Sequence, residues 1–225
     1  MEYTQKHKIL LQTFVHEGVL DENNAKELVI KLFDVDNVPL IINQINEQLQ
    51  PLDMLIKRCE CEITGELFWI FANTELDEVT RYQDEFSEMQ LALLRNVFSE
   101  IITSNDGSVK SMFCLNLCSL EDVKMSKAEA EEFLNDMVDR KWLAYKNGNY
   151  YMGVRSITEL MPYFRVTYKS NLSTCCLCKQ AIFHGERCNN CQAMLHLHCL
   201  KRYATVHNPV TCPTCKSAFP NTTLI

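Results

Sequence analysis

The sequence predicts a mainly α-helical fold with small β-hairpins, in the α+β class. Three observations carry this prediction. Apolar residues recur at helical spacing over most of the first 170 positions. Two segments of alternating apolar and polar residues turn back on themselves at glycine-containing turns. After position 170 the helical pattern gives way to paired Cys and His residues, which indicates a small domain that depends on metal more than on an apolar core.

Length and composition suit one large domain or two to three small ones. The 225 residues are 47% hydrophobic and 23% charged, which are ordinary values for a globular chain. No apolar run reaches the roughly 18 residues that span a bilayer, and the start lacks the apolar segment of a secretory signal. We therefore expect an intracellular protein without membrane contact, in which the 12 cysteines are free or bind metal.

The first unit is predicted to cover residues 1–74. Apolar residues follow the spacing of amphipathic helices in residues 7–17, 22–33 and 40–49. Pro51 ends the third helix. Strand-like alternation follows in residues 54–63 and 67–71, joined by a turn at Thr64-Gly65. Three helices followed by a hairpin is the order of a winged helix.

The same order is predicted to repeat after an acidic linker. The linker covers residues 75–85, and the second winged-helix unit covers residues 86–164. Apolar spacing predicts helices at residues 86–101, 108–117 and 126–138, the last opened by a Ser-x-x-Glu capping box. Asn147-Gly148 between two strand-like segments is a strong hairpin signal. A closing helix near residues 157–164 and a linker over residues 165–174 complete this part.

Winged helices often read DNA with the third helix, but these third helices lack the necessary charge. Residues 38–49 contain no Lys or Arg. Residues 126–140 carry five acidic side chains against Lys127 and Arg140, so phosphate would be repelled. The formal net charge of −7 also argues against a stand-alone nucleic-acid binder. Protein–protein docking is the favoured use of both units.

The carboxyl-terminal segment contains four pairs of candidate metal ligands, each with two residues between its members. The pairs are Cys175 and Cys178, Cys188 and Cys191, His196 and Cys199, and Cys212 and Cys215. A two-residue gap lets the chain turn around an ion so that both side chains reach it. Since four such ligands complete a tetrahedral structural zinc site, eight predict two zinc ions per chain.

Two ways of assigning these pairs to the two zinc ions, which we call wirings, are open. Consecutive pairs sharing an ion would give two separate zinc-bound loops. Interleaved pairs would place Cys175, Cys178, His196 and Cys199 on the first zinc, and Cys188, Cys191, Cys212 and Cys215 on the second. We favour the interleaved, cross-braced wiring, because a segment of roughly 48 residues has little apolar core and gains most from ions that join distant segments.

Three other residues compete as ligands. Cys176 and His198 each adjoin a candidate ligand, and adjacent residues do not easily chelate one ion. His184 lies in mid-loop without a paired partner and is interpreted as solvent-facing. A redox dithiol would explain one C-x-x-C motif but not four spaced pairs.

The order of four Cys, one His and three Cys is shared by PHD fingers and RING variants. A PHD finger typically carries Trp two residues before the seventh ligand, where this chain has Val210. RING domains dock a ubiquitin-conjugating enzyme through an apolar residue and a proline at the places occupied here by Leu177 and Pro213. A short helix at residues 200–206 would complete that groove. The sequence therefore favours a RING-type domain over residues 175–220.

Catalysis is expected only through this domain, and then without a covalent intermediate. The chain has no phosphate-cradling glycine loop and no nucleophile elbow. Many active RING domains place Arg directly after the last ligand, where this chain has Lys216. Lysine keeps the charge but lacks the planar donor fork, so we expect weak or partner-dependent activity.

Two tandem winged-helix units followed by a cross-braced two-zinc RING-like domain form a rare combination. It resembles the non-structural maintenance of chromosomes element 1 family, the RING subunit of the Smc-five/Smc-six chromosome maintenance complex. The resemblance covers nearly the whole chain and is strongest in Cys175–Cys215 and in Gly153–Leu160, which is similar to the family's junction after the second wing.

This resemblance implies a nuclear, chromosome-associated protein acting in homologous-recombination repair of DNA. It implies pairing with a winged-helix subunit of the melanoma-antigen (MAGE) type and with a kleisin-like subunit. It also implies ubiquitin-ligase activity enhanced by the MAGE-type partner, and double-stranded DNA bound mainly by the assembled subcomplex.

Three functions follow as hypotheses. The first is a RING-type ubiquitin ligase subunit in which Leu177 and Pro213 hold the conjugating enzyme and Lys216 steadies the ubiquitin thioester. The second is a non-catalytic assembly module whose zinc domain clamps a partner subunit. The third is a histone-tail reader of the PHD kind.

Overall fold

The first winged helix is confirmed in a computed structural model that describes residues 3–74, 86–207 and 209–219. Its helices are α1 (Gln5–Glu17), α2 (Glu22–Phe33) and α3 (Val38–Leu49), and its strands are β1 (Val19–Asp21), β2 (Met54–Glu60) and β3 (Leu67–Asn73). The sheet order is β1-β3-β2, and both pairings are antiparallel. Phe14, Ile41, Ile45 and Trp69 bury the apolar faces of these elements in one core.

Local side-chain chemistry sets the boundaries of these helices. The Asp21 carboxylate accepts the backbone N–H groups of Asn23 and Asn24 and so caps the start of α2. The Asn37 side chain accepts the N–H of Leu40 at the start of α3. Pro51 lies in a 3-10 turn over Gln50–Leu52 directly after α3.

The second winged helix repeats this order. Its elements are α4 (Glu88–Thr103), β4 (Ser108–Lys110), α5 (Ser111–Leu117), α6 (Lys127–Asp139), β5 (Leu143–Lys146) and β6 (Asn149–Met152). The sheet order is β4-β6-β5. The predicted capping box is present at α6: the Ser126 hydroxyl accepts the N–H of Glu129, and the Glu129 carboxylate accepts the N–H of Ser126.

The structure differs from the expected elements in three places. The sheet of each winged helix has a third strand, β1 in the first unit and β4 in the second, which the sequence pattern did not reveal. Residues 108–110, which were expected to be helical, form β4. The closing helix is two helices, α7 (Val154–Glu159) and α8 (Met161–Thr167), because Pro162 begins a new helical turn. Helix α8 therefore extends into the expected linker at residues 165–174, whereas the expected linker at 75–85 lies outside the described residues.

The zinc domain consists of short elements. They are β7 (Ser173–Thr174), β8 (Ala181–Ile182), β9 (Glu186–Arg187), β10 (Met194–Leu195) and α9 (Leu197–Ala204). Strand β7 pairs with β8, and β9 pairs with β10. Leu195, Leu200 and Val210 form a small core around the ligand cysteines.

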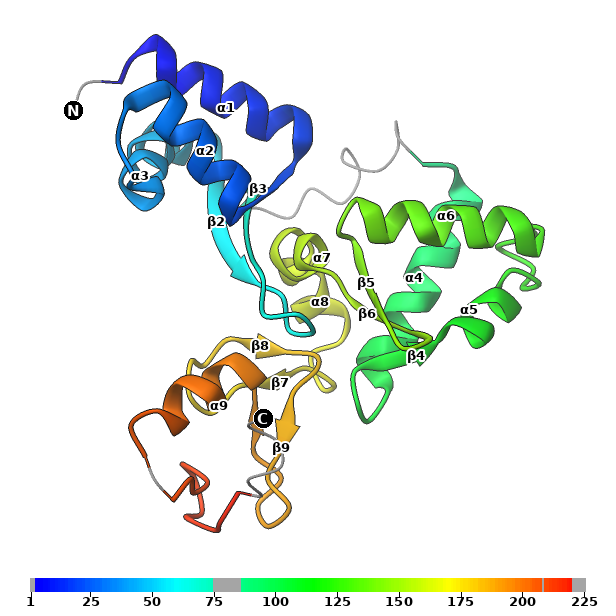
Figure 1. The fold of residues 1–225 in the computed structure, drawn as a ribbon. Helices are drawn as coiled ribbons and strands as arrows, with labels where there is room; N and C mark the ends of the chain where they lie inside the picture. Colours follow the sequence, from blue (N-terminus) through cyan, green and yellow to red (C-terminus); the bar gives the residue numbers. More distant parts are fainter. Residues whose placement is uncertain (1–2, 75–85, 208, 220–225) are drawn as a thin grey trace.

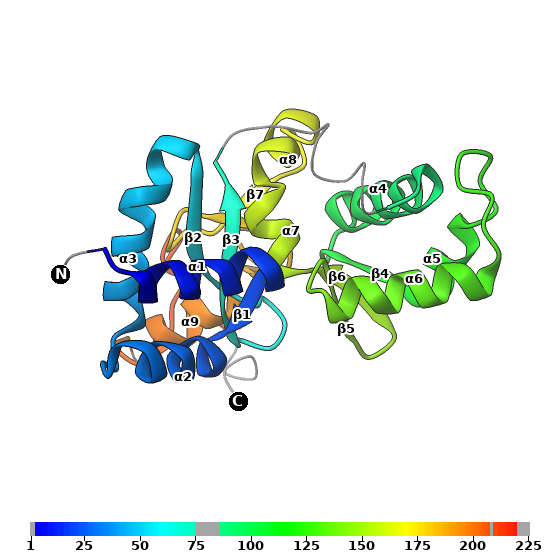
Figure 2. The same cartoon turned by 90° about the horizontal axis from the view of Figure 1, so that it is seen from above.

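The three parts meet around α7 and α8. Figure 1 shows the first unit, the second unit and the zinc domain as three lobes, with α7 and α8 between them. Seen from above in Figure 2, α7 lies beside β2 and β3 of the first unit and near β5 of the second, all of which it contacts. A small shared core joins Ile63, Phe68 and Ile70 of the first unit to Val154 of α7.

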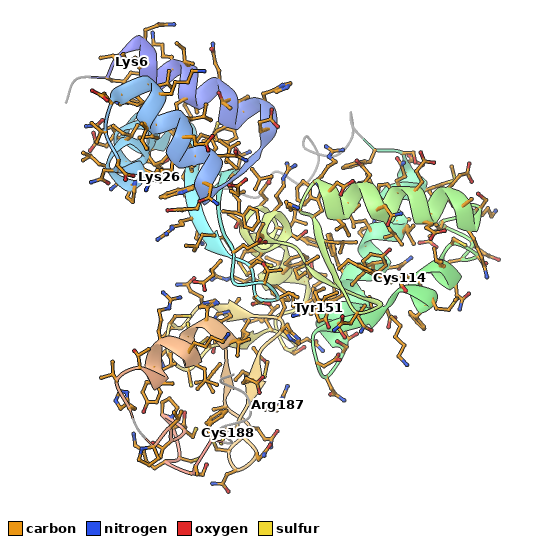
Figure 3. All side chains as sticks on the ribbon, in the orientation of Figure 1. Lys6, Lys26, Cys114, Tyr151, Arg187 and Cys188 are labelled. Atoms are coloured by element: carbon orange, nitrogen blue, oxygen red, sulfur yellow. The ribbon has the colours of Figure 1, made fainter. Side chains whose placement is uncertain are left out.

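The zinc domain is packed against both winged helices through the segment between β8 and β9. Phe183 is buried in the core of the second unit, and its ring centroid lies 5.7 Å from that of Phe164. Tyr151, labelled at the junction in Figure 3, packs its ring edge-on to His184 at 4.9 Å.

Among the described residues, no helix is long and apolar enough to cross a membrane.

Candidate metal centre

Three of the four candidate ligand pairs lie on the same kind of turn. In each turn the N–H of the residue after the second Cys donates to the carbonyl of the first Cys at 2.9 Å. The donating residues are Lys179, Gln192 and Lys216, and all three have positive φ, between 62° and 63°. This tight turn directs both thiols of a pair to the same side. The fourth pair differs, because His196 immediately precedes α9 and Cys199 lies in its first turn.

The first cluster brings together Cys175, Cys178, His196 and Cys199. Their ligand atoms all lie within 4.8 Å of one another. The His196 Nδ1 atom is 3.3 Å from the Cys178 Sγ atom and 3.8 Å from the Cys199 Sγ atom. Burial raises the pKa of Cys175, but backbone N–H groups of Cys178, His196 and Leu177 outweigh it and lower that pKa to about 7. This favours the thiolate that zinc requires.

The second cluster brings together Cys188, Cys191, Cys212 and Cys215. The Sγ atoms of Cys188 and Cys215 are 3.6 Å apart, as are those of Cys191 and Cys212. Figure 3 labels Cys188 within the zinc domain, next to Arg187. The Ser217 hydroxyl lies 2.9 Å from the Cys215 Sγ atom, and this hydrogen bond is the largest of several, including one from the Ser217 backbone N–H, that together lower the pKa of Cys215 to about 5.

Both clusters fit zinc, and the prediction of two zinc ions per chain is confirmed. Two thiolates on one tetrahedral zinc, each bonded at about 2.3 Å, lie roughly 3.8 Å apart, close to the observed separations. One donor set is Cys₃His and the other Cys₄, both of which are structural zinc sets. Alternate pairs form each cluster, so the consecutive wiring is excluded.

The competing residues lie outside both clusters. His198 stacks on His196 at a centroid distance of 4.7 Å. The His184 Nδ1 atom lies 2.6 Å from the carbonyl oxygen of Asp106 in the second unit, so His184 joins two domains instead of facing solvent alone. Cys176 is half-buried, and burial raises the pKa of its thiol.

The three predicted docking residues lie on two of the ligand turns. Leu177 and Pro213 stand between ligand cysteines, and both are half-buried. Lys216 is exposed, and its Nζ atom donates to the carbonyl oxygen of Pro213 at 3.2 Å. Helix α9 begins at Leu197 and ends at Ala204, earlier than the expected helix at 200–206.

Sequence reasoning missed two residues near the ligands. Ser217 follows the last ligand by two positions, and its Oγ atom contacts the Sγ atoms of Cys215 and Cys188. Glu62 comes from the first winged helix, and its Oε1 atom lies 3.2 Å from the His196 Nε2 atom. A hydroxyl close after the last ligand was a usable signal for Ser217. The sequence held no comparable signal for Glu62.

Fold and site define a class of protein: two joined winged helices that carry a cross-braced, two-zinc RING-like domain. Comparison with known proteins agrees. The model of the Nse1 non-SMC component of the SMC5-6 complex matches residues 7–160, and a RING-like domain model matches residues 175–215. The chain therefore belongs to the Nse1 family of non-SMC components.

Individual relatives match along nearly the whole chain. The human non-structural maintenance of chromosomes element 1 homolog is 32% identical over 97% of this chain and 85% of that protein. The Schizosaccharomyces pombe non-structural maintenance of chromosomes element 1 is 27% identical over 99% of this chain and 95% of that protein. A solved structure described as an Nse1-Nse3-Nse4 complex matches with a TM-score of 0.83 and 30% identity, covering 98% of both chains.

Proposed function

We propose that this chain is a RING-type ubiquitin-protein ligase subunit of an SMC5-6-type chromosome maintenance complex. The observation that carries the proposal is the cross-braced pair of zinc clusters, which presents Leu177 and Pro213 on two matching turns. In this function the two turns and α9 bind the conjugating enzyme. The zinc ions are structural and keep the turns in place.

The proposed chemistry is positioning. A thioester between ubiquitin and the conjugating enzyme reacts with an amine faster when it is held in a reactive geometry, and no bond to this chain is needed. Leu177 would supply an apolar contact surface for the conjugating enzyme, and the ring of Pro213 would supply a rigid contact surface. The Lys216 ammonium, which donates to the Pro213 carbonyl in the free chain, would turn to an acceptor on ubiquitin. A single ammonium restrains ubiquitin less than a guanidinium does, so we expect modest activity that a partner increases.

The proposed partners follow from the solved relative. That structure is described as an Nse1-Nse3-Nse4 complex, and it matches this chain over almost its full length. We infer a MAGE-type winged-helix subunit and a kleisin-like subunit as neighbours of this chain. Double-stranded DNA would contact mainly the assembled subcomplex, since α3 of this chain has no basic residue and α6 carries five acidic residues against one lysine. Nuclear, chromosome-associated action in homologous-recombination repair completes the proposal.

Ubiquitin discharge from a charged conjugating enzyme tests the ligase proposal, measured with and without the MAGE-type partner. Leu177→Glu should abolish discharge, because it places a charge where the enzyme would dock, while two zinc ions stay bound. Leu52→Glu, at an exposed leucine of the first winged helix, is the matched control and should leave discharge unchanged. Equal discharge by the wild type and Leu177→Glu would refute this docking site.

A non-catalytic assembly module is the alternative, and one observation favours it. The zinc domain is held against both winged helices by buried contacts at Phe183 and Glu62, as a rigid clamp would require. Under this alternative, Cys188→Ser should lose partner binding, and the wild type should show no discharge with any partner. Discharge that rises when the partner is added would exclude the purely structural role.

A further inference from the structure

Glu62 is a buried carboxylate that crosses from the first winged helix into the zinc domain. It follows β2 and the buried residue Cys61, and it is 6% exposed. Its Oε1 atom accepts the N–H of Phe183 at 3.2 Å, and its Oε2 atom accepts the N–H of His184 at 2.8 Å. Its Oε1 atom also lies 3.2 Å from the Nε2 atom of His196. These N–H groups compensate a charge that would otherwise be costly to bury.

His196 has different surroundings at its two ring nitrogens. The Nδ1 atom faces the thiols of Cys178 and Cys199, so it is the atom that would bind zinc. The Nε2 atom lies 3.1 Å from the carbonyl oxygen of Ala181 and 3.2 Å from Glu62 Oε1. Both neighbours of Nε2 are acceptors, so the ring proton resides on Nε2 and the lone pair of Nδ1 is left for the metal.

We propose that Glu62 is a positioning residue of the first zinc site. Its carboxylate holds the imidazole in one tautomer and orientation, and its negative charge makes Nδ1 a stronger donor to the metal. Because Glu62 belongs to the first winged helix, the strength of the first zinc site depends on the docking of that unit. By linkage, zinc binding strengthens the docking in return. This proposal does not rest on ligase activity.

Glu60 provides a matched comparison within the same hairpin. Its carboxylate also crosses to the zinc domain, where its Oε2 atom accepts a hydrogen bond from Arg202 at 2.8 Å and its Oε1 atom lies 3.6 Å from the Nδ1 atom of His198. Neither of these residues belongs to a zinc cluster. Substitution of Glu60 therefore measures how much the loss of a docking contact alone changes the zinc affinity. Substitution of Glu62 measures the combined effect of a lost docking contact and a lost contact with His196.

The test compares Glu62→Gln with Glu60→Gln in the full chain loaded with two metal ions. Glutamine keeps the shape of the glutamate side chain but carries no charge. Its amide NH₂ group also cannot accept the hydrogen bond of the backbone N–H that it would face. Chelator competition gives each affinity, and cadmium-113 NMR separates the ion with one nitrogen ligand from the ion with four sulfur ligands. Glu62→Gln should weaken the first site by about 10–100-fold and leave the second unchanged, whereas Glu60→Gln, which loses a docking contact but no contact with His196, should weaken the first site far less.

Three results would overturn the proposal. Unchanged affinity at the first site in Glu62→Gln would mean that the Ala181 carbonyl positions His196 alone. Equal weakening of both sites would indicate general loss of the fold. Equal weakening by Glu60→Gln and Glu62→Gln would reduce Glu62 to a docking contact.

A double-mutant cycle keeps the test valid if Glu62→Gln also loosens the fold. His196→Cys replaces the nitrogen ligand with a thiolate that has no second ring atom to orient. In that background Glu62→Gln should change the first-site affinity by no more than about twofold. If Glu62→Gln weakened the first site as much in the His196→Cys background as in the wild type, Glu62 would act independently of His196 and the proposal would be wrong.

Discussion

At the residue scale, the environment of each ligand is made by neighbours that bind no metal. Ser217 contacts two thiols of the second cluster, and Glu62 contacts the imidazole of the first. Such outer contacts fix the direction of a ligand's lone pair and stabilise its charged form. The eight ligands therefore account for only part of the strength of each zinc site.

Ser217→Ala should weaken the second zinc site and spare the first. The thiolate of Cys215 loses the hydroxyl donor at 2.9 Å, and outer-contact losses of this kind typically cost about 10–100-fold in affinity. Competition with a chromophoric chelator gives the affinity. Ser170→Ala is the control, since the Ser170 hydroxyl is exposed and donates to the side chain of neighbouring Asn171. Identical affinities in both variants would contradict the role given to Ser217.

Gly107 is the second residue-scale feature with a measurable consequence. Its φ is +68°, and a Cβ atom added there would lie 1.9 Å from the carbonyl oxygen of Phe183. Gly107→Ala should destabilise the protein by the roughly 1–3 kcal/mol of a left-handed non-glycine residue, plus the cost of separating the zinc domain from the second unit. Denaturant unfolding measures the loss of stability, and limited proteolysis near Phe183 detects separation of the zinc domain from the second unit.

Gly148→Ala is the control for the glycine test. Its φ is +80°, but an added Cβ atom would meet nothing within 4 Å. It should therefore show the backbone strain without the loss of docking. If Gly107→Ala destabilised the chain no more than Gly148→Ala does, the contact with Phe183 would have no energetic role.

At the element scale, the helices were predictable and the shortest strands were not. Apolar periodicity located α1 to α4 and α6 to within two residues, because each of these helices buries one face over several turns, whereas α5 begins three residues later than expected. Strands β1 and β4 have three residues each, too few to show alternation, and each pairs with a strand more than 35 residues away. Their existence depends on the hairpin that completes the sheet, which a local pattern cannot reveal.

Helix α6 illustrates a local signal with a stability consequence. The Ser126 hydroxyl and the Glu129 carboxylate satisfy each other's backbone N–H groups at its start, and this hydrogen bonding holds the pKa of Glu129 below its usual value. Ser126→Ala should lower the free energy of unfolding by about 1 kcal/mol at neutral pH, because the N–H of Glu129 loses its side-chain acceptor. Urea unfolding measures it, and Ser126→Asp, which can cap equally well, should recover most of the loss.

At the scale of the whole molecule, the zinc domain is an integral part of the fold. The ligand pairs were readable from spacing alone, because a two-residue gap has a direct geometric meaning. Their packing against the winged helices was not readable, because Glu62 and Phe183 are separated by 121 positions. No local pattern relates residues so far apart, and only the folded chain shows that the domain is held at both units.

Removal of zinc should therefore have graded effects across the molecule. Chelation should expose the backbone amides of β7 to α9, because metal binding supplies most of the folding free energy of that domain. Protection should fall partly around Phe164, which packs on Phe183, and persist around Ile41 in the first core. Hydrogen exchange read by mass spectrometry follows all three regions. Uniform loss of protection would mean that the winged helices also depend on zinc.

The most direct test of the account is an anomalous-scattering map at the zinc absorption edge from crystals of the full chain. We expect two peaks, one enclosed by Cys175, Cys178, His196 and Cys199 and the other by Cys188, Cys191, Cys212 and Cys215. A single peak, or a peak shared by the Cys175 and Cys188 turns, would contradict the cross-braced metal centre on which the proposed function depends.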